Sequence, residues 1–274
     1  MTSIALSIFD ISIRIEACPV AHPLVQTVFG AHKSQGSGPA RLNYRLHWRK
    51  NRRDFVLETP THTATTTRRG EALYWLEKHL TIDIQKQRPD LLFLHAAVVS
   101  YRERTLLMSG PSGAGKSSLT WGLLHKGYGY MSDELAPVDP ATGHVWPYLR
   151  AINLKQPLPA PYAPPSGYLE TEHALHIPVH LIPSDCERRP RPVTDVLLIE
   201  YAGRHRQPRI DSLRHAEALS RLYPNLLNGL AHAQAGLPAL SRVVERSHCY
   251  HFETGDLNTS CKLLENQLRD FAVS

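Results

Sequence analysis

The stretch Gly110-Pro111-Ser112-Gly113-Ala114-Gly115-Lys116-Ser117 fits the pattern G-x-x-x-x-G-K-[ST] at every fixed position. Glycines at these positions let backbone N–H groups turn inward around a polyphosphate without a clash from a Cβ atom. The lysine brings a point charge to the β- and γ-phosphates, and the serine offers a hydroxyl to Mg²⁺. The sequence therefore predicts a phosphate-binding loop for a nucleoside triphosphate, extending through Ser118 into the following helix.

The flanks of this loop fit the strand, loop and helix arrangement that the motif requires. Residues 105–108, Thr-Leu-Leu-Met, predict a short buried strand that runs into the loop. Residues 117–126 predict the following helix, with leucines on one face and Gly127 placed to end it. A glycine-rich turn that binds nothing is the alternative, and this context argues against it.

Length and composition fit one large domain or two unequal ones, because the chain has 274 residues. The net charge of +6 favours anionic ligands but is too small to imply DNA. The N-terminus lacks the pattern of a secretory signal and no segment is as long as a membrane span, so we expect a cytoplasmic protein without a membrane partner. Four scattered cysteines and the histidine spacing indicate neither a disulfide framework nor a zinc site.

Basic residues alternate with apolar ones over residues 41–49, which predicts a strand with one buried and one basic face. A solvated face is the simplest interpretation. A docking face for an acidic peptide or carrier protein is the alternative. A nucleic-acid-binding face is the third and least favoured interpretation, because no DNA- or RNA-binding signature accompanies the charge.

Residues 1–89 predict an N-terminal accessory α+β domain rich in β-structure. Alternation over residues 11–16 indicates a half-buried strand, residues 41–49 and 54–57 a hairpin, and residues 70–86 an amphipathic helix. Residues 90–274 predict a second domain that contains the loop.

Four further segments of the second domain are predicted to be strands, and the last segment a helix. The strands are residues 91–99, 128–131, 193–201 and 249–252, and the helix runs from Leu257 to Phe271. A turn at residues 140–143 leads into a short hairpin, and residues 216–240 form short helices. The proline-rich residues 156–192 predict irregular structure, either a substrate flap or a plain insertion.

Asp133 and Glu134 directly follow the strand that comes after the loop helix. In parallel α/β folds such strand ends open onto the ligand crevice. One carboxylate there could hold Mg²⁺ and the other could accept a proton from a substrate hydroxyl. Paired acids near a turn are usually only solvated, but this distance after a phosphate loop favours a functional pair.

The series His95-Ala96-Ala97, Gly110 to Ser117 and Gly127 to Glu134 resembles the C-terminal kinase domain of HPr kinase/phosphorylase. It is more similar still to HPr-kinase-related proteins of bacterial gene clusters, which include kinases that tailor lasso peptides. Residues 149–155 are similar to a further segment of that group, and the resemblance covers about residues 91–155. It implies an α/β fold with a P-loop kinase domain of the HPr kinase and phosphoenolpyruvate carboxykinase type.

The resemblance also implies a role for each matched residue. Lys116 would bind phosphate, Ser117 would ligate Mg²⁺, Asp133 would be the general base, and Glu134 would assist with metal or charge. His95 would lie beside the transferring phosphoryl group, with a histidine that only fills a strand position as the alternative. Arg150 and Lys155 would be phosphate or substrate clamps, or else ordinary surface charges.

HPr kinase/phosphorylase has a further glycine-rich segment with an acidic residue, which is linked to the bifunctional activity of that enzyme. We find no such segment in this chain. The resemblance therefore does not extend to reverse phosphorolysis or to HPr as the substrate. We expect ATP- and Mg²⁺-dependent transfer of the γ-phosphoryl group to a serine of a protein or peptide. A small-molecule kinase and a nucleotide-binding switch are the rival hypotheses, and a homo-oligomer stays open.

Overall fold

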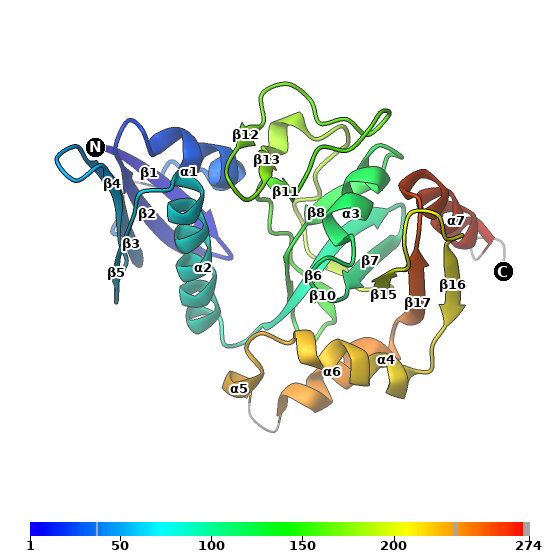
Figure 1. Cartoon of the computed structure of the whole chain (residues 1–274). Helices are drawn as coiled ribbons and strands as arrows, with labels where there is room; N and C mark the ends of the chain where they lie inside the picture. The colour runs from blue at the N-terminus through cyan, green and yellow to red at the C-terminus, as the bar shows by residue number, and fades with distance from the viewer. Residues whose placement is uncertain (37, 233–234, 271–274) are drawn as a thin grey trace. The chain divides into compact units, whose positions relative to one another are not determined.

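The computed structural model describes residues 1–36, 38–232 and 235–270 and shows a mixed α/β protein (Figure 1). Its contacts divide the chain into two compact units. Unit 1 contains residues 1–88 and 149–182, and unit 2 contains residues 89–148 and those from 183 onward. The predicted boundaries, 1–89 and 90–274, miss the return of residues 149–182 to the N-terminal unit.

Unit 1 is built on a five-stranded sheet with the order β1-β2-β3-β4-β5. The strands are β1 (Thr2–Ile8), β2 (Ile11–Ala17), β3 (Leu42–Arg49), β4 (Asp54–Glu58) and β5 (Thr63–Thr66). Apolar residues alternate with polar ones along β1, β2 and β3, so one face of these strands is buried and the other faces solvent. The predicted hairpin is confirmed, because Arg49 pairs with Asp54 in an antiparallel register.

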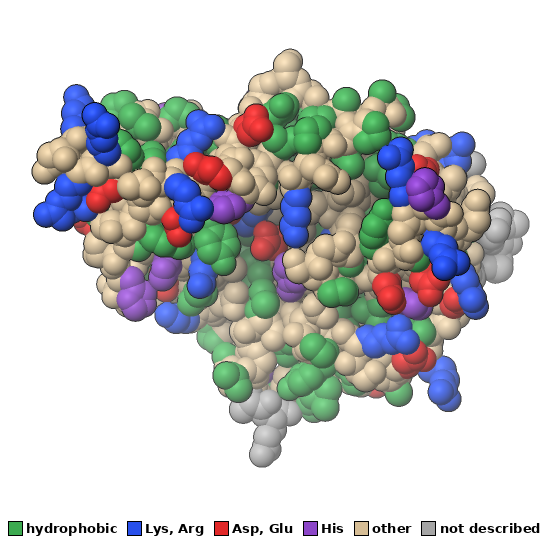
Figure 2. All heavy atoms as spheres, in the orientation of Figure 1, with side chains coloured by type: hydrophobic (Ala, Val, Ile, Leu, Met, Phe, Trp, Pro, Cys, Tyr) green, Lys and Arg blue, Asp and Glu red, His purple; other side chains and the backbone are tan. Residues whose placement is uncertain are grey.

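Two arginines of β3, Arg45 and Arg49, are paired with carboxylates. Arg45 Nε lies 2.9 Å from Glu16 and its Nη1 lies 3.3 Å from Glu58. On the visible face of the molecule, Figure 2 likewise shows Lys and Arg side chains interspersed with Asp and Glu. The alternation over residues 41–49 therefore forms a mixed-charge face, as expected of a solvated surface.

Two helices and a small second sheet complete unit 1. The helices are α1 (His22–Phe29) and α2 (Arg69–Gln87), with short 3₁₀ helices at Gly30–His32 and Val179–Leu181. The small sheet consists of β11 (Ile152–Leu154), β12 (Leu169–Glu170) and β13 (Leu175–Ile177). The Ala151 N–H donates to the Val28 carbonyl at 3.0 Å, which ties residues 149–182 to this unit.

Unit 2 contains a nine-stranded sheet with the order β14-β10-β9-β6-β7-β15-β17-β16, and β8 also pairs with β6. The strands are β6 (Leu92–Tyr101), β7 (Arg104–Ser109), β8 (Gly129–Ser132), β9 (Leu135–Val138), β10 (His144–Val145), β14 (Arg191–Pro192), β15 (Asp195–Tyr201), β16 (Arg209–Ser212) and β17 (His248–Thr254). β7, β15 and β17 run parallel, and β6 is antiparallel to β7.

Helices cover both faces of this sheet (Figure 1). They are α3 (Lys116–Leu124), α4 (His215–Leu222), α5 (Gly229–His232), α6 (Gly236–Glu245) and α7 (Leu257–Asp270), with a 3₁₀ helix at Tyr223–Asn225. Side chains of α4 and α6 join the core on one face, and α3 packs against α7 on the other. Burial on two faces explains why β6, β7 and β15 are almost continuously apolar in sequence.

The predicted elements of unit 2 are present, with adjusted bounds. The turn at residues 140–143 joins β9 and β10, and the expected last helix is α7; its predicted end at Phe271 lies outside the described residues. The proline-rich segment is largely irregular but contains β12, β13 and β14. Across the described parts of the chain, no helix has the length and apolar character needed to cross a membrane.

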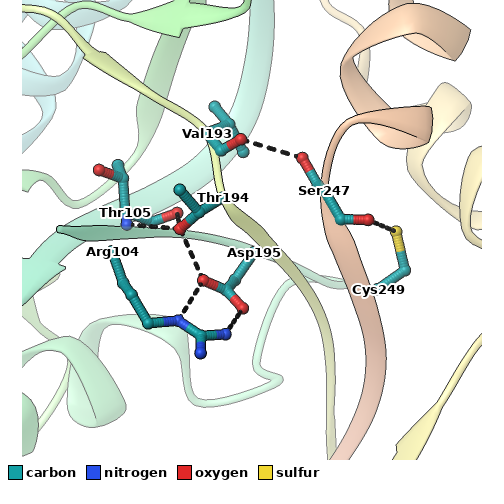
Figure 3. A network of polar contacts seen from close by, with 7 residues as sticks. All are labelled: Arg104, Thr105, Val193, Thr194, Asp195, Ser247 and Cys249. Carbon is teal, nitrogen blue, oxygen red and sulfur yellow. Dashed lines mark hydrogen bonds and ion pairs between the residues drawn. The ribbon is translucent and has the colours of Figure 1, made fainter. Parts of the chain in front are cut away.

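A polar network joins the starts of β7, β15 and β17 (Figure 3). The Arg104 guanidinium forms an ion pair with Asp195, whose side chain is fully buried. The Thr194 hydroxyl donates to the same carboxylate at 2.7 Å, and the Ser247 hydroxyl donates to the Val193 carbonyl at 3.1 Å. These bonds fix the strands at one edge of the sheet, and the glycine-rich loop of residues 110–115 leaves β7 at the opposite edge.

We expect Asp195→Ala to lower the free energy of unfolding by about 3–5 kcal/mol, because it leaves a largely buried guanidinium without its carboxylate. Urea unfolding followed by circular dichroism measures the change. Arg209→Ala is the matched control, because it breaks an exposed pair with Asp211 and should cost less than about 1 kcal/mol. Equal stability of the two variants would contradict the structural role given to Asp195.

Candidate functional site

The loop from Gly110 to Gly115 connects the end of β7 to the start of α3, so the predicted strand, loop and helix arrangement is confirmed. Gly113 and Gly115 both have φ of +87°, a backbone conformation that side-chain-bearing residues rarely adopt. Pro111 and Ser112 are exposed, whereas Ala114 is buried. The loop thus turns sharply at the surface while one side chain anchors it to the core.

Lys116 is the first residue of α3 and is largely buried. Its ammonium donates to the Gly110 carbonyl at 2.7 Å and to the Pro111 carbonyl at 3.2 Å. The side chain therefore turns back over the loop, and its charge lies at the centre of the turn. Ser117 and Ser118 follow in the first helical turn and are partly exposed.

His95 lies in the middle of β6, directly beside the strand that feeds the loop. Its neighbour Ala96 pairs with Ser109, and the Ser109 hydroxyl donates to the His95 carbonyl at 3.2 Å. Burial lowers the pKa of His95, the positive charge of Lys116 lowers it further, and Glu134 raises it in part. The imidazole is therefore neutral at pH 7, and Lys116 and Glu134 lie close enough to act on it.

Asp133 and Glu134 lie in a break between β8 and β9. These two strands pair with the same side of β6, one after the other, and the acidic pair lies in the short gap between them. The Ser132 hydroxyl bridges the break by donating to the Leu135 carbonyl at 2.7 Å. The prediction that the strand ends at the acidic pair is confirmed, because β8 ends at Ser132; the sequence did not show that the chain resumes pairing with β6 at Leu135.

The two carboxylates of the break differ in exposure. Asp133 is only 4% exposed, whereas Glu134 is exposed. A strand irregularity beside a functional group is a common way to redirect side chains. Here it presents one shielded and one solvated carboxylate, which suits two different chemical roles.

Strand pairing places three of the predicted groups, the loop, His95 and the acidic pair, next to one another in the sheet. Ala96 in β6 faces Ser109 in β7 on one side, and its N–H donates to the Glu134 carbonyl at 3.2 Å on the other. The glycine-rich loop begins at Gly110, directly after Ser109. The loop, the β6 histidine and the acidic pair therefore lie on three neighbouring strand paths within unit 2.

Arg150 and Lys155 belong to unit 1, which does not contain the loop. Arg150 is 3% exposed, and its guanidinium lies 3.4 Å from Glu77 of α2. Burial lowers the pKa of the nearby His176 to about 4, with a further contribution from the positive charge of Arg150. Arg150 is thus a buried residue of unit 1 and not a surface charge, whereas Lys155 is exposed.

The donor set at the loop suits a magnesium–nucleotide complex better than a metal held by protein alone. Mg²⁺ is usually held by one or two carboxylates, a hydroxyl and phosphate oxygens. Ser117, Asp133 and Glu134 are groups of this kind. The described residues contain no cluster of three or more His, Cys, Asp or Glu that could hold a metal ion without a ligand.

Sequence reasoning missed the residues of β15 and β17 that border the loop. A Cβ atom at Gly110 would overlap the carbonyl oxygen of Ile199 in β15. A Cβ atom at Gly115 would lie 4.0 Å from the hydroxyl oxygen of Thr254, the last residue of β17. The order of the parallel strands could not be read from the sequence. The sequence therefore did not indicate that Ile199 and Thr254 lie beside the loop.

We expect Gly110→Ala to lower the free energy of unfolding by about 1–3 kcal/mol, because the new methyl group forces apart the loop and the Ile199 carbonyl. Urea unfolding measures this change. Gly229→Ala is the control within unit 2, because its nearest neighbour would lie at an ordinary 3.5 Å. A Gly110→Ala protein as stable as this control would show that the close approach is not needed.

Comparison with protein-family models and with curated proteins found no match to this chain.

Proposed function

We propose that this protein is an ATP-dependent phosphotransferase that moves the γ-phosphoryl group to a serine hydroxyl of a protein or peptide. The observation that carries the proposal is the placement of the loop with Lys116, the neutral His95 and the acidic pair on neighbouring strand paths. The resemblance to HPr-kinase-related proteins supports the choice of ATP and of a serine acceptor.

The first step is binding of the triphosphate by the loop. Backbone N–H groups and the start of α3 favour negative charge. Lys116, which donates to the carbonyls of Gly110 and Pro111, would exchange these partners for β- and γ-phosphate oxygens. Ser117 and Glu134 would hold Mg²⁺, which supplies charge neutralisation on the phosphates when bound.

The second step is attack by the acceptor hydroxyl on the γ-phosphorus. A bond forms between the serine oxygen and phosphorus, the bond to the β–γ bridging oxygen breaks, and ADP leaves. Asp133 would accept the hydroxyl proton, and Lys116 would stabilise the charge that develops on the phosphates. His95 would lie beside the transferring group as a neutral hydrogen-bonding partner, because its pKa is lowered.

Labelled ATP separates this proposal from its rivals. Incubation with [γ-³²P]ATP, Mg²⁺ and an array of serine-containing peptides should label peptides. Label that appears only on hydroxyl-bearing metabolites would indicate a small-molecule kinase. Nucleotide binding without any labelled acceptor would indicate a switch module.

We expect Lys116→Ala to weaken MgATP binding by about 10- to 100-fold, because it removes a charged hydrogen-bond donor to the phosphates. Isothermal titration calorimetry measures the dissociation constant. Lys262→Ala is the matched control, because this lysine is exposed on α7. Unchanged affinity in Lys116→Ala would argue against the loop as the triphosphate site.

We expect Asp133→Asn to lower the rate of phosphoryl transfer by about 100- to 10,000-fold, because the amide cannot accept the hydroxyl proton. MgATP affinity should change much less, since the loop and Lys116 are intact. The rate is measured by transfer from [γ-³²P]ATP to the peptide labelled best by the wild-type protein. Transfer at the wild-type rate would exclude Asp133 as the base.

A further inference from the structure

A basic loop follows β15 and was not assigned any role by the sequence analysis. It reads Ala202-Gly203-Arg204-His205-Arg206-Gln207-Pro208, and we name residues 202–208 the basic loop. Its three consecutive cationic or titratable residues, Arg204, His205 and Arg206, are all exposed. An exposed, arginine-rich loop is a candidate anion-binding element, so its place in the fold decides what it could bind.

The basic loop lies at the same edge of the sheet as the phosphate loop. β15 runs parallel to β7, and Leu198 pairs with Ser109. The chain therefore leaves both strands at the same edge, and Gly110 packs closely on Ile199 three residues before the basic loop begins. The carboxyl edge of parallel strands is where ligands bind in α/β folds.

Contacts with the end of β17 hold the basic loop beside the start of α7. The Ala202 N–H donates to the Thr254 carbonyl at 2.9 Å, and the Arg206 N–H donates to the Gly203 carbonyl at 3.0 Å. A Cβ atom at Gly255 would overlap the Arg206 carbonyl oxygen. In Figure 1 the yellow segment after β15 accordingly passes beside α7.

Thr254 lies near both the basic loop and the phosphate loop, because a Cβ atom at Gly115 would lie 4.0 Å from its hydroxyl oxygen. The helix that follows, α7, packs on α3 through Leu257 and Cys261, which lie close to Gly122. The segment that positions the basic loop therefore also lies near the end of the phosphate loop and leads into the helix that packs on α3.

Two acidic groups near the basic loop are paired elsewhere. Glu200 lies 3.2 Å from His251, and Asp211 forms an ion pair with Arg209. Among the residues that the structure describes, no ion pair involves Arg204 or Arg206. Two guanidinium groups at the ligand edge are thus available to a negatively charged or aromatic partner.

The order of the strands places this loop and the acidic pair on opposite sides of the phosphate loop. The acidic pair borders β6, on one side of β7, whereas the basic loop follows β15, on the other. If the γ-phosphate points toward the acids, the nucleoside end of the nucleotide points toward β15. This step rests on the proposed function.

We propose that Arg204 and Arg206 bind the nucleoside end of ATP, through the α-phosphate and the face of the base. Guanidinium groups suit both partners, because they form paired hydrogen bonds with phosphate and stack on aromatic rings. Under this proposal, Arg204 and Arg206 bind the nucleotide although they lie outside the phosphate-loop motif.

The test compares MgATP with magnesium pyrophosphate, which represents the β- and γ-phosphates without the α-phosphate and the nucleoside. Calorimetry gives the dissociation constants for the wild-type protein, for Arg204→Ala/Arg206→Ala and for the control Arg209→Ala. Arg209 is a neighbouring exposed arginine that already has an acidic partner. Melting temperatures of the three proteins establish that each is folded.

We expect the double variant to bind MgATP about tenfold or more weakly, and pyrophosphate as tightly as the wild-type protein does. Arg209→Ala should bind both ligands normally. An equal loss for both ligands would place the arginines on the terminal phosphates and overturn the assignment. Unchanged MgATP affinity in the double variant would also overturn it, while leaving the proposed function intact. A wild-type protein that binds neither ligand would overturn the proposed function and this assignment together.

Discussion

The site depends on the position of β6 between two different neighbours. On one side Ala96 faces Ser109, the last residue before the phosphate loop, and on the other its N–H holds the carbonyl of Glu134. Because hydrogen-bonded strands are held a few ångströms apart, these two pairings fix the spacing between loop and acids. A register slip of one residue along β6 would turn His95 to the other face of the sheet.

The sheet around this position is stiff for identifiable reasons. Buried side chains on both faces of β6, β7 and β15 leave little room for a strand to shift. At the opposite edge the Arg104–Asp195 pair and its threonine partner fix the strand starts. The irregular segments, including the phosphate loop and the break at the acidic pair, are therefore held by regular neighbours, which is the usual arrangement for functional groups.

Unit 1 contains a buried polar cluster that helps hold its segments together. Arg150 and Glu77 lie together in its interior, and the charge of Arg150 helps keep His176 neutral. Removing one member of such a pair leaves a buried charge, so the pair favours one particular placement of residues 149–182 against α2. Together with the hydrogen bond from Ala151 to Val28, the pair ties residues 149–182 to the N-terminal unit.

The sequence by itself determined the local structure of this protein. Glycine spacing around Lys116, apolar runs in β6 and β7, and alternation in β2 and β3 depend only on neighbouring residues, so these elements could be predicted. Tertiary structure decided which strands are neighbours, and with that the break at Asp133, the packing of Gly110 on Ile199 and the burial of Arg150. Such contacts join residues that are distant along the chain, and no local pattern encodes which distant surface each residue meets. For the same reason, the sequence showed the lysine and the acidic pair as candidates, while only the order of strands in the sheet brought them together.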